Sequence, residues 1–243
     1  TNEICKICKR EFERGKINVS SAGTLLSFME KPNFKMSFGF AQYCAEGNLC
    51  GDTIKTINDS RGHMVFIISD GMGKGSRAAL DGAMGAGLLS KLLSAGFGFD
   101  SSLKVVNSAL LVKSHEESLA TLDCVRVDLF SGKCEFYKAG APRSYIVKDD
   151  RLTKCELTSM PAGILRGVEF AKRTTVLNTD DEIIMMSDGV TDVGNEWLEK
   201  FLRLETTLEP NEKAKAILKI ALENSDEKHR DDMSVIVAKM LER

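Results

Sequence analysis

Residues 63–71 read HMVFIISDG and residues 181–189 read DEIIMMSDG, so two apolar runs far apart in the chain share the ending Ser-Asp-Gly. Val, Ile and Phe favour a buried, pleated strand, and the glycine that follows interrupts the pattern. Each run therefore predicts a strand with an aspartate at its tip, Asp70 in the first and Asp188 in the second.

Two more acidic sites lie next to or within predicted strands. Asp231 and Asp232 stand directly before the apolar run 233–238, and Asp52 follows Gly51 in another strand-like segment. Carboxylates that converge without basic partners repel one another strongly, and a divalent cation is the simplest way to neutralise them. The pattern indicates a metal-dependent enzyme.

The length and composition bound the class of protein. With 243 residues, 43% of them hydrophobic, the chain can bury a full core, and we favour one large domain. A net charge of −2 offers no general attraction to nucleic acid or to a membrane surface, and neither is expected as a partner of this fragment. Seven scattered cysteines favour a reducing compartment over a disulfide framework. The longest apolar stretch, residues 78–99, contains Asp81 and Lys91 and is a poor membrane span.

The pattern along the chain predicts groups of strands separated by pairs of helices. Two short helices are expected within residues 1–31, on either side of residues 15–21, and Pro32 ends that segment. Further helices are expected at 76–93, 101–115, 196–202 and 211–224. Strands are expected at 38–44, 49–57, 64–69, 121–129, 134–139, 144–147, 170–176, 183–187 and 233–238, with turns at 131–132 and 148–150. This order predicts an α+β fold of antiparallel sheets with helices packed outside.

A hard cation fits this set of oxygen ligands. Mg²⁺ and Mn²⁺ prefer carboxylate and carbonyl oxygens, and two such ions about 3.5–4 Å apart can share one bridging carboxylate. Hydrolysis of a phosphate ester is the chemistry best served, because the cations neutralise phosphoryl oxygens and activate a water. Asp70 is the best candidate for the bridge, since the flexible Gly71 lets its carbonyl turn toward the same ion. The structural alternative is that each Asp-Gly pair only marks a turn.

Other motifs lead to weaker predictions. Residues 71–76, GMGKGS, follow a strand and open a helix, but their spacing matches neither the phosphate loop nor the dinucleotide fingerprint. Lys74 in this segment is expected either to neutralise a substrate phosphate or to be an exposed loop residue. Cys5 and Cys8 are expected on a helix face, because no second pair completes a zinc site. His229 is expected to be solvated, with proton transfer to the leaving group as the alternative.

The acidic motifs, taken in order, resemble the metal-dependent PPM-type protein serine/threonine phosphatases, in the branch of sporulation stage II protein E. The motifs are Gly51-Asp52, residues 69–75 (SDGMGKG), residues 187–190 (SDGV) and residues 231–234 (DDMS), and the resemblance covers roughly residues 38–240. It implies a central β-sandwich of two antiparallel sheets flanked by pairs of helices, with two Mn²⁺ or Mg²⁺ ions at one end.

The resemblance also implies roles for individual residues. Asp70 would bridge the metals and act in catalysis with Asp188 and Asp231, Gly71 would add its carbonyl, and Asp52 would complete the set of metal ligands. Many relatives carry asparagine at the position of Asp232, so the choice between Asp231 and Asp232 as a ligand is left open.

The same resemblance suggests a substrate and a setting. The substrate would be a phosphoserine on a small anti-anti-sigma-type protein, whose dephosphorylation activates a sporulation sigma factor. Residues 1–36 would form a helical linker or regulatory segment before a phosphatase domain at 37–243. Full-length relatives carry membrane spans upstream, which would place this domain on the cytoplasmic side; whether it forms a homodimer is left open.

Two alternatives complete the predictions. The chain could be a catalytically silent binding or regulatory module of the same fold, although a silent copy has no chemical reason to keep mutually repelling carboxylates. The helix expected at 76–93 contains Gly82, Gly85 and Gly87, each of which costs about 1 kcal/mol relative to alanine. Close packing explains them; the alternative, suggested by the resemblance, is a helix that shifts Asp70 and Gly71 into or out of metal-binding geometry.

Overall fold

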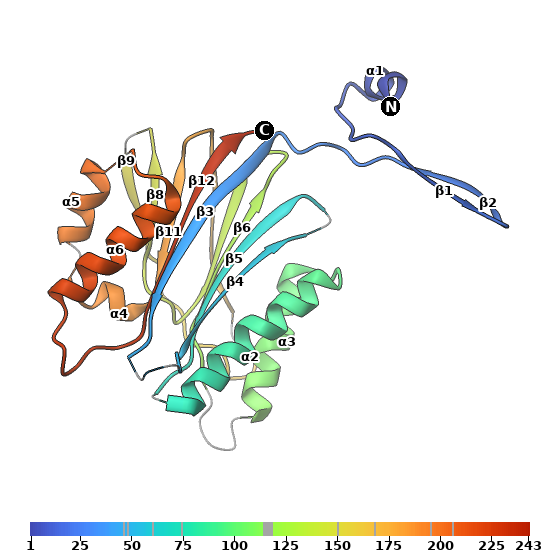
Figure 1. Ribbon diagram of the computed structural model, residues 1–243. Coiled ribbons are helices and arrows are strands. Elements are labelled where there is room, and N and C mark those ends of the chain that lie inside the picture. The colour runs from blue at the N-terminus through green and yellow to red at the C-terminus, as the bar shows by residue number, and fades with distance from the viewer. Residues whose placement is uncertain are drawn as a thin grey trace.

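The computed structural model contains a β-sandwich with helices on both outer faces (Figure 1). It describes residues 1–45, 47, 49–59, 61–73, 75–113, 119–149, 151–167, 169–194, 196–205 and 207–243. Sheet I has the strand order β10 (Ala171–Val176), β7 (Lys133–Ala139), β6 (Leu122–Asp128), β5 (His63–Asp70) and β4 (Asp52–Asn58). Sheet II has the order β3 (Phe34–Tyr43), β12 (Met233–Glu242), β11 (Glu182–Met186), β8 (Ser144–Lys148) and β9 (Arg151–Cys155). All neighbours pair antiparallel, so the predicted fold class is confirmed.

The helices cover the sandwich as two groups. Helices α2 (Gly75–Ser94) and α3 (Phe99–Lys113) pack on the outer face of sheet I, and α4 (Asp188–Thr191), α5 (Glu196–Leu204) and α6 (Pro210–Asn224) lie beside sheet II (Figure 1). Residues 64–68 of strand β5 are all apolar because both faces of the strand are buried there. Val65 and Ile67 pack under α2 and α3, whereas Phe66 and Ile68 lie between the two sheets.

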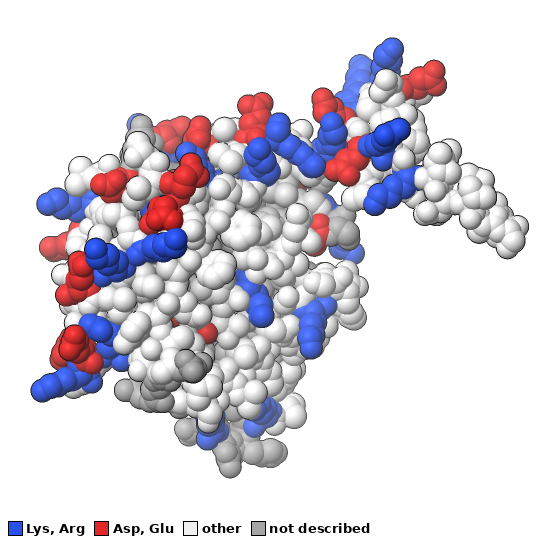
Figure 2. Space-filling model, in the orientation of Figure 1, with Lys and Arg blue, Asp and Glu red and all other residues white. Residues whose placement is uncertain are grey.

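The N-terminal segment extends away from the sandwich as an arm (Figure 1). It contains helix α1 (Asn2–Cys8) and a separate hairpin of β1 (Lys16–Ser20) and β2 (Gly23–Ser27). The first predicted helix is confirmed and the second is wrong. Gly23 adopts a positive φ of 139° after the turn, and residues 23–27 then pair with β1. The far part of the hairpin carries no charge (Figure 2), and its large apolar side chains are 55–78% exposed: Ile17, Val19, Leu25 and Leu26.

Several boundaries differ from the sequence prediction. Strand β9 and the short helix α4 were not expected, because RLTKC carries no apolar run and DGVT is too short to show a period. The division between residues 36 and 37 stays a prediction, and β3 crosses it. The end of the helix predicted at 101–115, the turn residue Asp150 and Lys74 lie outside the described residues. Within the described ranges, no helix is both long and apolar enough to cross a membrane.

Candidate metal centre

Sheet I brings Asp52 and Asp70 to one end of the sandwich. Asp70 is the last residue of β5 and Asp52 the first of β4, and the two stand directly opposite each other in the antiparallel pair. The pairing extends one step further, because Gly71 N–H donates to the carbonyl of Gly51 at 3.2 Å. Strand geometry therefore fixes two carboxylates side by side at this edge.

Sheet II brings two more acidic positions to the ends of its strands. Strand β11 ends just before Ser187, and Asp188 is the first residue of α4. Strand β12 begins just after Asp232 and runs antiparallel to β11, with Ser187 N–H donating to Ser234 O at 3.0 Å. Asp188 and the pair Asp231-Asp232 consequently lie at the same end of sheet II. We call Asp52, Asp70, Asp188, Asp231 and Asp232 the acid cluster.

The acids of the two sheets act on one another electrostatically. Burial, followed by the negative charges of Asp188, Asp52, Asp231 and Asp232, raises the pKa of Asp70 to about 8. Burial also raises the pKa of Asp188, with Asp231 among the charges that add to the shift. Carboxylates from four separate segments thus repel one another across the end of the sandwich.

The carboxylate of Asp52 is buried, and neither of its oxygens is hydrogen-bonded within the described residues. Burial, followed by the charges of Asp188 and Asp232, raises its pKa to about 6, and the hydroxyls of Ser187 and Ser234 offset part of that shift. Those hydroxyls do not reach hydrogen-bonding geometry, because neither buried oxygen of Asp52 has a partner among the described residues. A buried carboxylate without donors is costly, and a hard cation is a ligand that would satisfy it.

The acid cluster is open rather than tightly closed. No three of the described Asp, Glu, His or Cys side chains lie close enough together to surround one ion. Unscreened carboxylates repel one another, and a cation would draw them inward. The donor set consists of oxygens alone, which fits Mg²⁺ or Mn²⁺ and does not suit softer metals.

Helix α2 packs tightly on the backbone of this end through its glycines. A Cβ atom on Gly82 would lie 2.2 Å from Gly51 O, and one on Gly71 would lie 1.9 Å from Ala78 O. A Cβ on Gly85 would lie 2.8 Å from Ser69 Oγ, whereas one on Gly87 would meet nothing within 4 Å. Close packing therefore explains Gly82 and Gly85, but it does not explain Gly87.

The two neighbouring aspartates differ in their surroundings, which sequence reasoning missed. The carboxylate of Asp232 accepts hydrogen bonds from Ala45 N–H at 2.7 Å and Gly51 N–H at 2.5 Å. Asp231 is exposed and accepts the N–H of Asp232 itself at 2.8 Å. The partners of Asp232 lie more than 180 residues away in sequence, so no local pattern could reveal them.

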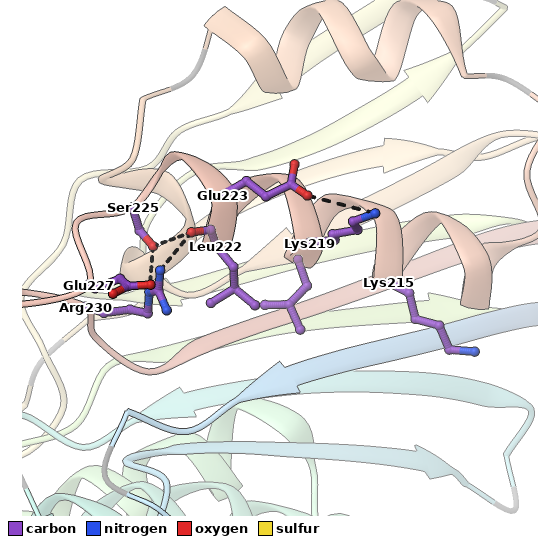
Figure 3. Close-up of a pocket in the computed structure, with 8 residues that line it drawn as sticks. Lys215, Lys219, Leu222, Glu223, Ser225, Glu227 and Arg230 are labelled. Carbon is purple, nitrogen blue, oxygen red and sulfur yellow. Dashed lines mark hydrogen bonds and ion pairs between the residues drawn. The ribbon is translucent and has the colours of Figure 1, made fainter.

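Two hollows border this end. One of about 210 Å³ adjoins the acid cluster and is lined by Tyr43, Ala45, Leu49, Gly73, Gly75, Glu227, Lys228, Arg230, Asp231 and Asp232. The other runs along α6 and contains no member of the cluster (Figure 3). Arg230 borders both, and it donates to Ser225 Oγ at 2.8 Å and to Leu222 O at 3.0 Å.

His229, Cys5 and Cys8 make no hydrogen bond to the acid cluster within the described part of the chain. His229 is exposed and its Nδ1 lies 2.8 Å from an oxygen of Asp226. Cys5 and Cys8 both belong to α1 in the arm, as expected for helix-face cysteines. Neither observation supports a catalytic or zinc-binding role.

A family model described as Stage II sporulation protein E (SpoIIE) matches residues 60–241. The chain is 28% identical over 222 residues to Stage II sporulation protein E of Bacillus subtilis (strain 168), covering 88% of this chain and 27% of that protein. It is 31% identical over 200 residues to Stage II sporulation protein E of Priestia megaterium, covering 80% of this chain and 34% of that protein. The chain thus spans about a third or less of these relatives.

Solved structures share the fold. The PP2C phosphatase domain of Bacillus subtilis SpoIIE, solved with a fragment of its regulatory domain, superposes with a TM-score of 0.84 at 25% identity, covering 100% of this chain and 73% of that one. The catalytic domain of the serine/threonine phosphatase PstP, solved in complex with two manganese ions, gives a TM-score of 0.68 at 19% identity, covering 86% and 100%. The second likeness shows the fold alone.

Proposed function

We infer the function of this chain from the family to which it belongs: it is a member of the stage II sporulation protein E family and a PPM-type protein serine/threonine phosphatase domain. We propose that it hydrolyses phosphoserine on a small regulatory protein of the anti-anti-sigma type, and thereby activates a sporulation sigma factor. The proposed cofactor is a pair of Mn²⁺ or Mg²⁺ ions, and the proposed setting is the cytoplasmic side of the membrane.

The observation that carries the proposal is the convergence of carboxylates from both sheets around the unpartnered oxygens of Asp52. In the proposal, Asp52, Asp70, Asp188 and Asp231 hold the cations through their carboxylates, and Gly71 contributes its carbonyl. Asp70 is the proposed bridge, because the charges of all the other members of the cluster act on it.

The proposed mechanism needs no covalent enzyme intermediate. When bound, the divalent cations neutralise phosphoryl oxygens and lower the pKa of the attacking water. With the cations bound, Asp70 and Asp188 would be deprotonated, and their positions at the end of β5 and the start of α4 would fix where the cations hold the phosphoryl group for in-line attack.

The test measures phosphate release from a phosphoserine protein by the purified domain, with Mn²⁺ or with EDTA. We expect Mn²⁺-dependent release, and we expect Asp70→Asn to abolish turnover while circular dichroism stays native. Asp180→Asn is a matched control, since Asp180 is an exposed partner of Lys239 at the other end of β11.

Two results would contradict the proposal. Wild-type turnover by Asp70→Asn at excess Mn²⁺ would show that the site is assigned wrongly. Absence of any Mn²⁺-dependent release, with Mn²⁺ binding retained, would favour the silent binding module instead. Anomalous scattering from crystals soaked in Mn²⁺ would locate the ions directly.

A further inference from the structure

We propose that Asp232 is a positioning residue that fastens the segment bearing Asp52 to the segment bearing Asp231, and that Asp231 alone of this pair is a metal ligand. The metal-ligand part rests on the proposed function. The fastening part rests on contacts within the chain, and it can be tested without metal or substrate.

The first observation is the double hydrogen bond of the Asp232 carboxylate. One oxygen accepts Ala45 N–H at 2.7 Å and the other accepts Gly51 N–H at 2.5 Å. Both amides belong to the connection between β3 and β4, and Gly51 directly precedes Asp52. Hydrogen bonds to an ionised acceptor are roughly twice as strong as neutral ones, so this carboxylate holds the connection at two points.

The second observation is the close packing at Gly51. A Cβ atom there would lie 3.1 Å from Oδ2 of Asp232 and 3.5 Å from Gly71 O. The absence of a side chain at Gly51 lets the carboxylate of Asp232 approach its amide beside the metal loop.

The third observation is a parallel tie through Gln42 on β3. Its Nε2 donates to the carbonyl of Asp52 at 3.0 Å and lies 3.0 Å from Ser234 Oγ. Asp52 is therefore tied to the segment around the start of β12 by two routes, one through Gly51 and Asp232 and the other through Gln42 and Ser234. Its own carboxylate remains without a partner among the described residues.

The fourth observation concerns Asp231, which lies between two anchored residues. Arg230 is bound to Ser225 and Leu222, as Figure 3 shows, and its guanidinium lies 5.6 Å from the centre of the Tyr43 ring. Asp232 is bound to Ala45 and Gly51. The exposed carboxylate of Asp231 is thus presented from a backbone fixed on either side, whereas each oxygen of Asp232 already has a donor.

The test compares Asp232→Asn and Asp232→Ser with Asp231→Asn, the same change one residue earlier. Amide hydrogen exchange of Ala45 and Gly51 is measured by NMR in EDTA, because an amide nitrogen or a shorter side chain cannot accept both N–H groups. We expect exchange of these two amides to be about 10- to 100-fold faster in both Asp232 variants and unchanged in Asp231→Asn.

Mn²⁺ titration by calorimetry then separates ligand from positioning residue. We expect Asp231→Asn to lose measurable binding at one site, and Asp232→Asn to weaken binding about 3- to 10-fold with turnover recovered at saturating Mn²⁺. Unchanged exchange at Ala45 and Gly51 in both Asp232 variants would overturn the fastening role. Loss of Mn²⁺ binding in Asp232→Asn equal to that in Asp231→Asn would overturn the assignment of the ligand. A wild-type domain without phosphatase activity would contradict the proposed function and leave the exchange result decisive for Asp232.

Discussion

At the scale of single residues, the carboxylates of the acid cluster repel one another, and binding a proton or a cation reduces this repulsion. Asp70 has a pKa near 8 because burial and the surrounding carboxylates both disfavour its charged form. An unperturbed aspartate has a pKa near 4. Between these two values the folded chain binds a proton at Asp70 that the unfolded chain has released.

This difference predicts how the stability of the metal-free domain depends on pH. Because the folded state binds more protons, the free energy of unfolding falls as pH rises from about 4 through about 8. We expect the melting temperature in EDTA to decrease between pH 6 and pH 8.5, and the decrease to be smaller in Asp70→Asn. Calorimetric melting across this range tests it, and a melting temperature that rises with pH would contradict it.

At the scale of elements, helix α2 illustrates what a sequence can and cannot predict. The three glycines predicted close packing, yet only Gly82 and Gly85 face backbone or side-chain atoms of the strand ends. The faces of a helix that meet a sheet depend on where the strands end, which composition does not specify. Gly87 remains without a packing reason.

Replacing Gly82 or Gly87 by alanine should therefore have opposite effects on stability. Gly87→Ala should stabilise the domain by up to about 1 kcal/mol, because alanine favours the helix and nothing crowds its methyl group. Gly82→Ala should cost about 1–3 kcal/mol, because its methyl group would meet Gly51 O. Urea unfolding of the two variants measures both values, and equal shifts in the same direction would contradict the packing described.

The sequence was enough to predict which apolar runs carry an aspartate of the candidate site at their ends, but not the contacts of Asp232. The positions of Asp70 and Asp188 were predictable because each follows an apolar run and precedes a glycine. Asp70 is the last residue of β5, and Asp188 begins α4 two residues after β11 ends. The two hydrogen bonds of the Asp232 carboxylate could not be predicted, because their donors, Ala45 N–H and Gly51 N–H, lie far away in the sequence. The second strand of the hairpin in the arm, GTLLS, was mistaken for part of a helix, and the first, KINVS, for a connection, because both are too short to show the period of a strand.

At the scale of the whole molecule, a buried ion pair within sheet I is hydrogen-bonded to Ser144 of sheet II. Lys138 of β7 is fully buried, and its Nζ donates to Asp123 at 2.6 Å, to Pro142 O at 2.6 Å and to Ser144 Oγ at 2.8 Å. Asp123 belongs to sheet I and Ser144 to sheet II. One oxygen of Asp123 has no partner among the described residues.

Replacing one member of this ion pair should lower the free energy of unfolding far more than replacing both. Lys138→Met leaves a buried, uncompensated carboxylate and should cost about 3–5 kcal/mol. The double variant Lys138→Met/Asp123→Asn should recover much of that loss. Lys215→Met, which removes an exposed pair with Glu212, should change stability by less than about 1 kcal/mol. Urea unfolding compares the three, and equal losses in the single and double variants would refute the reasoning.

The strand order of sheet II has a consequence for synthesis. Strand β12 is the last element of the chain, yet it lies between β3 and β11 and pairs with both. On the ribosome, β3 emerges long before β11 and β12, and the edges that β3 and β11 offer to β12 stay unpaired until Met233–Glu242 leaves the exit tunnel. A nascent chain therefore cannot connect β3 to β11, or bring the acid cluster together, before β12 has been synthesised.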